Sequence, residues 1–231
     1  MDLYCLPYAG ASSAVYKKWE KPLGGELRIQ SIELPGRGRK FGKMRLNSME
    51  QMIEHVFEEL KGRLESGEPY GLFGHSLGGM LAYRLVERIG QAGLPAPRHL
   101  FISGVLPPHA TRPYMIDHTL PDIELKNELQ RLGGLTSEVL DHPELLKLML
   151  PIIRSDLQAH NDEHTFRTQA GPVPCDMTVF YGRQDPLTEG DMGGWSLYTS
   201  MNFQIEAYAG GHFFIHDEEA SLTRTMVSRL K

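Results

Sequence analysis

Residues 71–81, GLFGHSLGGML, contain side chains whose types and spacing suit nucleophilic chemistry. Gly74, Ser76 and Gly78 fit the G-x-S-x-G pattern, in which a sharp turn between a strand and a helix exposes a serine hydroxyl. Glycine is needed on both sides because neighbouring backbone comes very close to such a turn. The pattern alone also fits a glycine-rich turn selected for close packing. Its surroundings must therefore decide between the two interpretations.

The flanking segments favour a nucleophile. Residues 70–76 form a continuous apolar run typical of a buried strand, and the next residues have the apolar spacing of a helix. Ser76 then lies at the strand-to-helix junction that the pattern requires. The start of a helix also stabilises negative charge that develops nearby.

A nucleophilic serine needs a histidine base and an acid that orients the histidine. In proteins with the G-x-S-x-G turn, these residues follow one another along the chain in the order Ser, Asp, His. Asp185 follows the apolar run 177–182, and His212 follows the run 203–209. Because functional groups of open parallel sheets gather at the carboxyl ends of the strands, both side chains can reach Ser76. We predict that Ser76, Asp185 and His212 form a catalytic triad.

Other candidates for these roles lie close by. Asp191 is six residues beyond Asp185, which we expect to be too far. His216 is expected inside the helix that follows His212, and His75 is expected to be a packing residue. For the oxyanion hole we predict two backbone N–H donors, those of Leu77 and Ala9, with Gly10 as the alternative to Ala9.

A second pattern could bind metal. Residues 160–164, HNDEH, match H-x-x-E-H, in which two histidines and a glutamate serve a zinc enzyme. The segment is charged and lies at the end of a predicted helix, with no evident further ligand nearby. We therefore expect surface histidines and no metal.

The remaining chain predicts one α/β domain over residues 1–231, with a mostly parallel sheet flanked by helices. Strands are expected at 3–8, 29–34, 70–76, 100–105, 177–182 and 203–209. Helices are expected at 48–64, directly after Ser76, and from about 217 to the end. Residues 107–170 lack a convincing strand but contain helical patterns at 122–134 and 142–160. We interpret this segment as a helical lid.

Composition limits the class of protein. The 231 residues carry a net charge of −5, which disfavours nucleic acid as the main partner. Two cysteines, Cys5 and Cys175, lie in or beside apolar runs and do not suggest a disulfide framework. Without a signal peptide or a span long enough for a bilayer, we expect a soluble, cytoplasmic monomer without a membrane partner.

Several motifs together resemble the type II thioesterases, stand-alone α/β-hydrolase enzymes of non-ribosomal peptide and polyketide synthesis. They are LYCLPYAGAS, IELPGRGRKFGK, GHSLGG, LGGL, PELLKLMLPIIRSDLQ, VFYGRQD and GGHFF, in this order. The resemblance implies hydrolysis of acyl or aminoacyl thioesters on the phosphopantetheine arm of carrier domains, to edit stalled or misprimed synthases. It places the triad on Ser76, Asp185 and His212 and the oxyanion donors on Leu77 and Ala9. It implies no cofactor beyond the arm carried by the substrate.

Two further groups of residues are assigned to binding. Met149, Leu150 and Ile153 belong to an apolar stripe of the insertion that could line an acyl pocket or simply dock the insertion on the core. Arg37, Arg39 and Lys40 lie in a basic stretch that could attract an acidic carrier domain or be a solvated loop. Alternative functions are a small-molecule carboxylesterase or acyltransferase with the same triad, and a non-catalytic carrier-binding partner.

Overall fold

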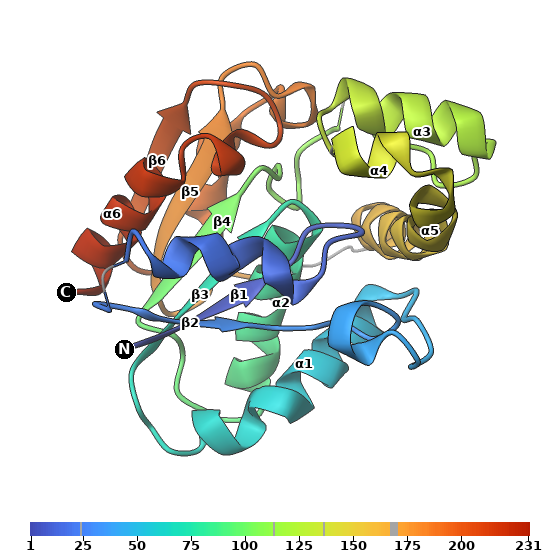
Figure 1. Cartoon of the computed structure of the whole chain (residues 1–231). Helices are drawn as coiled ribbons and strands as arrows, with labels where there is room; N and C mark the ends of the chain where they lie inside the picture. Colours follow the sequence, from blue (N-terminus) through green and yellow to red (C-terminus); the bar gives the residue numbers. More distant parts are fainter. Residues whose placement is uncertain (24, 113, 136, 167–170) are drawn as a thin grey trace.

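The computed structural model describes residues 1–23, 25–112, 114–135, 137–166 and 171–231, and its centre is a six-stranded sheet (Figure 1). All neighbouring strands are parallel, in the order β2-β1-β3-β4-β5-β6. The strands are β1 Asp2–Leu6, β2 Arg28–Ser31, β3 Tyr70–His75, β4 His99–Ser103, β5 Asp176–Gly182 and β6 Phe203–Tyr208. The chain order changes direction between β1 and β3, where ligands bind in open parallel sheets.

Helices cover both faces of the sheet. The α-helices are α1 Met49–Leu64, α2 Leu77–Gln91, α3 Asp122–Arg131, α4 Ser137–Asp141, α5 Pro143–Phe166 and α6 Glu219–Leu230. The 3-10 helices are η1 Ser13–Glu20, η2 Gly38–Lys40, η3 Pro186–Thr188, η4 Met192–Tyr198 and η5 Phe214–His216. Helices α1 and α2 pack on one face, and η1 and α6 pack on the other. Within the described part of the chain, no helix has the length and apolar character needed to cross a bilayer.

The strands read as continuous apolar runs because both faces of the sheet are buried. In β3, Leu72 packs with α1 and α2, whereas Phe73 packs with η1 and α6. The same alternation holds in β4, where Leu100 and Phe101 enter opposite clusters. A side-chain period of two therefore supplies two separate apolar layers.

The predicted elements are present, with differences at their ends. All six strands occur, and none of their ends moves by more than three residues. Helix α5 continues to Phe166, beyond the predicted end at 160, and α6 begins at Glu219. The 3-10 helices η1, of eight residues, and η4, of seven, were not predicted, because such short segments give little periodic signal.

The insertion between β4 and β5 contains α3, α4 and α5, which group together on one side of the molecule (Figure 1). These helices share a small apolar cluster of their own, separate from the two clusters that cover the sheet. Ala9 and Phe213, from the loops after β1 and β6, pack against that cluster. The insertion is thus seated on the loops that follow the strands. That it opens and closes as a lid stays a prediction.

Candidate active site

Ser76 occupies the sharp turn between β3 and α2. Its φ of 55° and ψ of −120° make it the one non-glycine residue with positive φ in the described part of the chain. Its backbone N–H donates to the carbonyl oxygen of Ser103, at 2.7 Å. A strained backbone of this kind persists only where surrounding structure holds it, and it is typical of functional sites.

The glycines around Ser76 are required by close backbone contacts. A Cβ on Gly74 would lie 1.9 Å from the carbonyl oxygen of Gly78. A Cβ on Gly78 would lie 2.3 Å from the carbonyl oxygen of Leu6 in β1. Both distances are far inside van der Waals contact, so the turn excludes any side chain at these positions. Tight packing and a half-buried serine that lines the cavity are therefore two consequences of one geometry.

Asp185 and His212 meet across two neighbouring loops. Asp185 follows β5 and His212 follows β6, and β5 and β6 are paired. His212 Nδ1 lies 2.8 Å from Asp185 Oδ2, and both residues are buried. The other carboxylate oxygen, Oδ1, accepts from the N–H of Leu187 at 2.9 Å, which fixes the carboxylate plane. His212 and Ser76 line the same cavity.

The competing residues lie elsewhere. Asp191 is exposed at the start of η4. His216 belongs to η5, not to the last helix as predicted, and its Nε2 lies 3.1 Å from the hydroxyl of Tyr8. His75 is fully buried with Nδ1 2.9 Å from Ser103 Oγ, and burial lowers its pKa well below the usual value. The contact with Ser103 gives His75 a packing role, and its burial favours the neutral ring.

The two predicted oxyanion donors belong to the residue after Ser76 and to a residue that lines the same cavity. Leu77 is the first residue of α2, where an N–H has no acceptor within the helix. Ala9 lines the cavity together with Ser76. The alternative donor is excluded in this arrangement, because the N–H of Gly10 donates to Asp156 Oδ2 at 2.7 Å.

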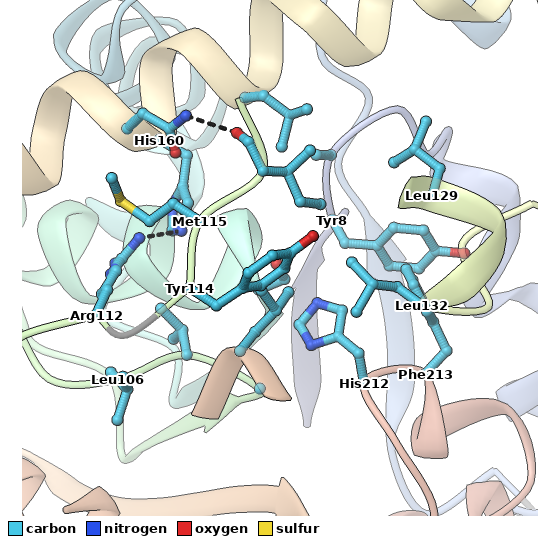
Figure 2. Close-up of a pocket in the computed structure, with 18 residues that line it drawn as sticks. Tyr8, Leu106, Arg112, Tyr114, Met115, Leu129, Leu132, His160, His212 and Phe213 are labelled. Carbon is cyan, nitrogen blue, oxygen red and sulfur yellow. Dashed lines mark hydrogen bonds between the residues drawn. The ribbon is translucent and has the colours of Figure 1, made fainter. Parts of the chain in front are cut away.

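The cavity runs from Ser76 and His212 beneath the helical insertion (Figure 2). Its walls are mostly apolar, with contributions from the β4–α3 loop, α3, α5 and the loop after β6. Figure 2 labels Tyr8, Leu106, Arg112, Tyr114, Met115, Leu129, Leu132, His160, His212 and Phe213 among the lining residues. A polar group breaks this surface, where Arg112 Nη1 lies 2.7 Å from His160 Nε2.

The predicted pocket residues of α5 are wrong. None of the three is among the residues that line the cavity: Leu150 and Ile153 are buried in the cluster shared by α3, α4 and α5, and Met149 packs against it. Leu157, His160 and Asn161, about one to two turns further along α5, line it instead. The sequence shows an apolar stripe on this helix but not how far along the stripe the cavity lies. The wall residues of the β4–α3 loop have no periodic signal and were missed.

The predicted docking role of Arg37 is also wrong. Arg37 is only 2 % exposed and forms an ion pair with Asp156 of α5, so it cannot contact a docked protein. Lys40 is part-buried and pairs with Glu59 at 2.6 Å. Arg39 keeps a side chain that is 62 % exposed. A docking role for Arg39 and Lys40 stays a prediction.

The residues of the H-x-x-E-H pattern have other partners. His160 contacts Arg112, and Glu163 forms an ion pair with Arg84 of α2. The side chain of His164 lies outside the described part of the structure. Among the described residues, no group of three or more histidine, cysteine, aspartate or glutamate side chains has an arrangement that could hold a metal ion.

Comparison with known proteins identifies the family. Residues 1–229 match the family model described as the thioesterase domain. Linear gramicidin dehydrogenase LgrE of Brevibacillus parabrevis is 32 % identical over 234 residues, which span 99 % of this chain and 87 % of that protein. The chain therefore belongs to the thioesterase family.

Solved structures agree in fold over nearly the whole chain. ClbQ from the colibactin NRPS/PKS pathway has a TM-score of 0.90 and 30 % identity, covering 99 % of this chain and 96 % of its own. The type II thioesterase BorB from the borrelidin biosynthetic cluster has a TM-score of 0.88 and 30 % identity, covering 100 % and 92 %. The predicted α/β-hydrolase fold and the resemblance to type II thioesterases are confirmed.

Proposed function

We propose that this protein hydrolyses acyl and aminoacyl thioesters carried on the phosphopantetheine arm of carrier domains. The observation that carries the proposal is the pairing of His212 with Asp185 in the same cavity as Ser76. Membership of the thioesterase family supports the reaction class. The pathway names of relatives such as ClbQ support synthase-bound substrates and an editing role.

The first half of the reaction forms an acyl-enzyme. Ser76 Oγ attacks the thioester carbonyl carbon while Nε2 of His212 accepts the hydroxyl proton. Nδ1–H of His212 donates to Asp185, whose carboxylate holds the ring and stabilises its positive charge. The N–H groups of Leu77 and Ala9 stabilise the oxyanion. The carbon–sulfur bond then breaks, and the departing thiolate receives the proton held by His212.

The second half releases the acyl group as an acid. His212 takes a proton from a water molecule, which attacks the ester carbonyl, and returns a proton to Ser76 Oγ as the ester bond breaks. Protein groups and water balance every step, so we propose that no cofactor is needed. The cavity beneath the insertion is the site where the acyl chain binds during both halves.

The carrier domain is a separate protein domain that must dock near the active site. We propose that the exposed, positively charged side chain of Arg39 attracts it.

Both cysteines are free and buried, and burial raises the pKa of the Cys175 thiol to about 12. Inert, reduced thiols of this kind support a cytoplasmic location.

A carrier domain loaded with an acetyl-phosphopantetheine arm provides the test. Intact-protein mass spectrometry follows deacylation by the native enzyme and by Ser76→Ala. We expect release that falls by at least about 10³-fold in the variant, because the covalent path is lost. If the native protein is inert on carriers but cleaves matched oxygen esters, the triad stands and the thioesterase assignment fails. If Ser76→Ala keeps full activity, the nucleophile is wrong.

A further inference from the structure

A buried ion pair joins the helical insertion to the loop after β2. Arg37 Nη1 lies 2.5 Å from Asp156 Oδ2, and Arg37 Nη2 lies 2.7 Å from Asp156 Oδ1. Arg37 is 2 % exposed, and Asp156 of α5 is fully buried. This bidentate arrangement is the strong form of an arginine–carboxylate contact, and it compensates the charge of a carboxylate held away from water.

The same carboxylate also holds the loop after β1. Asp156 Oδ2 accepts the backbone N–H of Gly10 at 2.7 Å. Arg37 Nη1 lies 3.4 Å from the carbonyl oxygen of Ala11. Gly10 has a φ of +79°, and a Cβ there would lie 2.4 Å from Ile153 Cγ1 of α5. Helix α5 therefore rests directly on the backbone at Gly10, with a carboxylate aimed at its amide.

This contact lies one peptide away from the proposed oxyanion hole. The amide of Gly10 belongs to the peptide group that joins it to Ala9, so a bond to that amide sets the plane of the peptide after Ala9. Ala9 is the residue whose own N–H would face the substrate oxygen. Oxyanion donors act because they are held in place before the reaction, and small errors in their direction reduce the rate.

We propose that Asp156 is a positioning residue of the oxyanion hole, so that hydrolysis requires α5 to be seated on the Gly10 loop. The proposal rests on the proposed function. Arg37 holds the carboxylate of Asp156 in place through two hydrogen bonds. Asp156 in turn aligns Gly10, which aligns Ala9. The insertion thus has a second role beside forming the cavity: its position decides whether the oxyanion hole is formed. A displaced α5 leaves the amide of Gly10 without its acceptor.

The structure offers a matched control on the same helix. Glu163 of α5 forms an ion pair with Arg84 of α2, which also ties the insertion to the core. This pair joins α5 to α2, where Arg84 also lies 3.0 Å from Glu87, whereas the carboxylate of Asp156 accepts from the N–H of Gly10. A general effect of loosening α5 would appear in both pairs. An effect through the oxyanion hole would appear only at Asp156.

The first experiment compares Asp156→Ala, Asp156→Asn and Glu163→Gln on the acetylated carrier domain, with Ser76→Ala as the blank. For Asp156→Ala we expect kcat to fall about 10²-fold, the scale for loss of one oxyanion donor, with KM changed less than about threefold. Affinity for an alkylboronic acid, which forms a tetrahedral adduct on Ser76, should fall in parallel. Asp156→Asn, which keeps an acceptor for Gly10, should recover much of kcat, and Glu163→Gln should stay within about threefold.

A double variant separates positioning from stability. Asp156→Ala leaves Arg37 buried and unpaired, which destabilises the fold, whereas replacing a buried pair by apolar residues of similar size is often tolerated. Arg37→Met with Asp156→Leu should therefore fold, as judged by thermal unfolding, and still show the loss of kcat and of boronate affinity. Normal kcat in this folded double variant would overturn the proposal, as would equal losses in Asp156→Ala and Glu163→Gln. If Ser76→Ala deacylates the carrier domain as fast as the native enzyme, the proposed function is refuted instead.

Discussion

His212 Nδ1 lies 2.8 Å from Asp185 Oδ2, and these two residues come from loops that follow neighbouring strands. The contact directs Nδ1 to the acid and leaves Nε2 as the ring atom that can act as base. Asp185→Asn keeps the size of the side chain but disturbs the tautomer of His212. We expect kcat on an acylated carrier to fall by about 10³- to 10⁴-fold with little change in KM.

Asp191→Asn is the control for this change, because Asp191 is the exposed acid six residues further along the loop. It should keep native steady-state kinetics. Comparable losses in the two variants would show that Asp185 has no special role.

The glycines of the turn at Ser76 provide a test of packing. Gly78→Ala places a Cβ 2.3 Å from the carbonyl oxygen of Leu6, where backbone must shift on both sides. We expect the free energy of unfolding, measured in urea, to fall by about 3 kcal/mol or more. In the same helix, a Cβ on Gly90 meets nothing within 4 Å. Gly90→Ala should raise the free energy of unfolding by about 0.5–1 kcal/mol. Equal effects of the two substitutions would contradict the close backbone contact at Gly78.

Because His99 is buried in a neutral form, we expect the free energy of unfolding to decrease in mild acid. Burial lowers its pKa to about 4, with Arg229 adding to the effect and Asp176 opposing it. The ring stacks on Phe101 with 4.3 Å between centroids, and Nε2 lies 2.8 Å from Thr178 Oγ1. Above pH 6.5 both folded and unfolded chains keep His99 neutral. As the pH falls from about 6.5 to about 4, the unfolded chain binds a proton that the folded chain does not, so stability decreases.

Urea unfolding at pH 7.5 and at pH 5 measures this contribution. His99 should account for about 2 kcal/mol of the decrease, from 1.36 kcal/mol for each unit of pH below 6.5. His99→Gln removes the titrating ring, so its free energy of unfolding should decrease by about 2 kcal/mol less over the same interval. An unchanged decrease in the variant would show that His99 titrates alike in both states.

The shape of the cavity predicts that kcat/KM depends on the length of the substrate's acyl chain. Leu132 lines the cavity beside Phe213, so Leu132→Phe fills space that a long acyl chain would occupy. We expect kcat/KM for an octanoyl carrier to fall about 10-fold or more, while that for an acetyl carrier changes less than about threefold. Leu148→Phe on α5 is the control, because Leu148 is 55 % exposed and outside the cavity. Parallel losses on both substrates would place the acyl chain elsewhere.

Patterns along the chain were enough to predict the six strands and to propose the chemistry. The six apolar runs predicted the six strands, because strands buried on both faces need apolar side chains at every position. Ser76, Asp185 and His212 were each proposed from a residue type placed at or just after the end of such a run. The parallel sheet then brings the ends of those runs to one edge, so local order was sufficient to place the candidate site.

Local patterns could not predict contacts between segments that lie far apart in the sequence. Arg37 stands in a basic stretch, and nothing beside it in sequence reveals that Asp156, 119 residues away, buries and pairs it. The cavity walls come from an irregular loop and from α5, and the sequence does not show how far along that helix the cavity lies.

The sequence by itself therefore determined the strands, the turn at Ser76 and the order of the proposed triad, because these depend on local backbone geometry and on which faces are apolar. Only the tertiary structure decided which charges are buried, which residues line the cavity, and that Gly10 is held by a carboxylate from the insertion. Those properties depend on how α5 is seated against loops far away in sequence, and no local pattern encodes that placement.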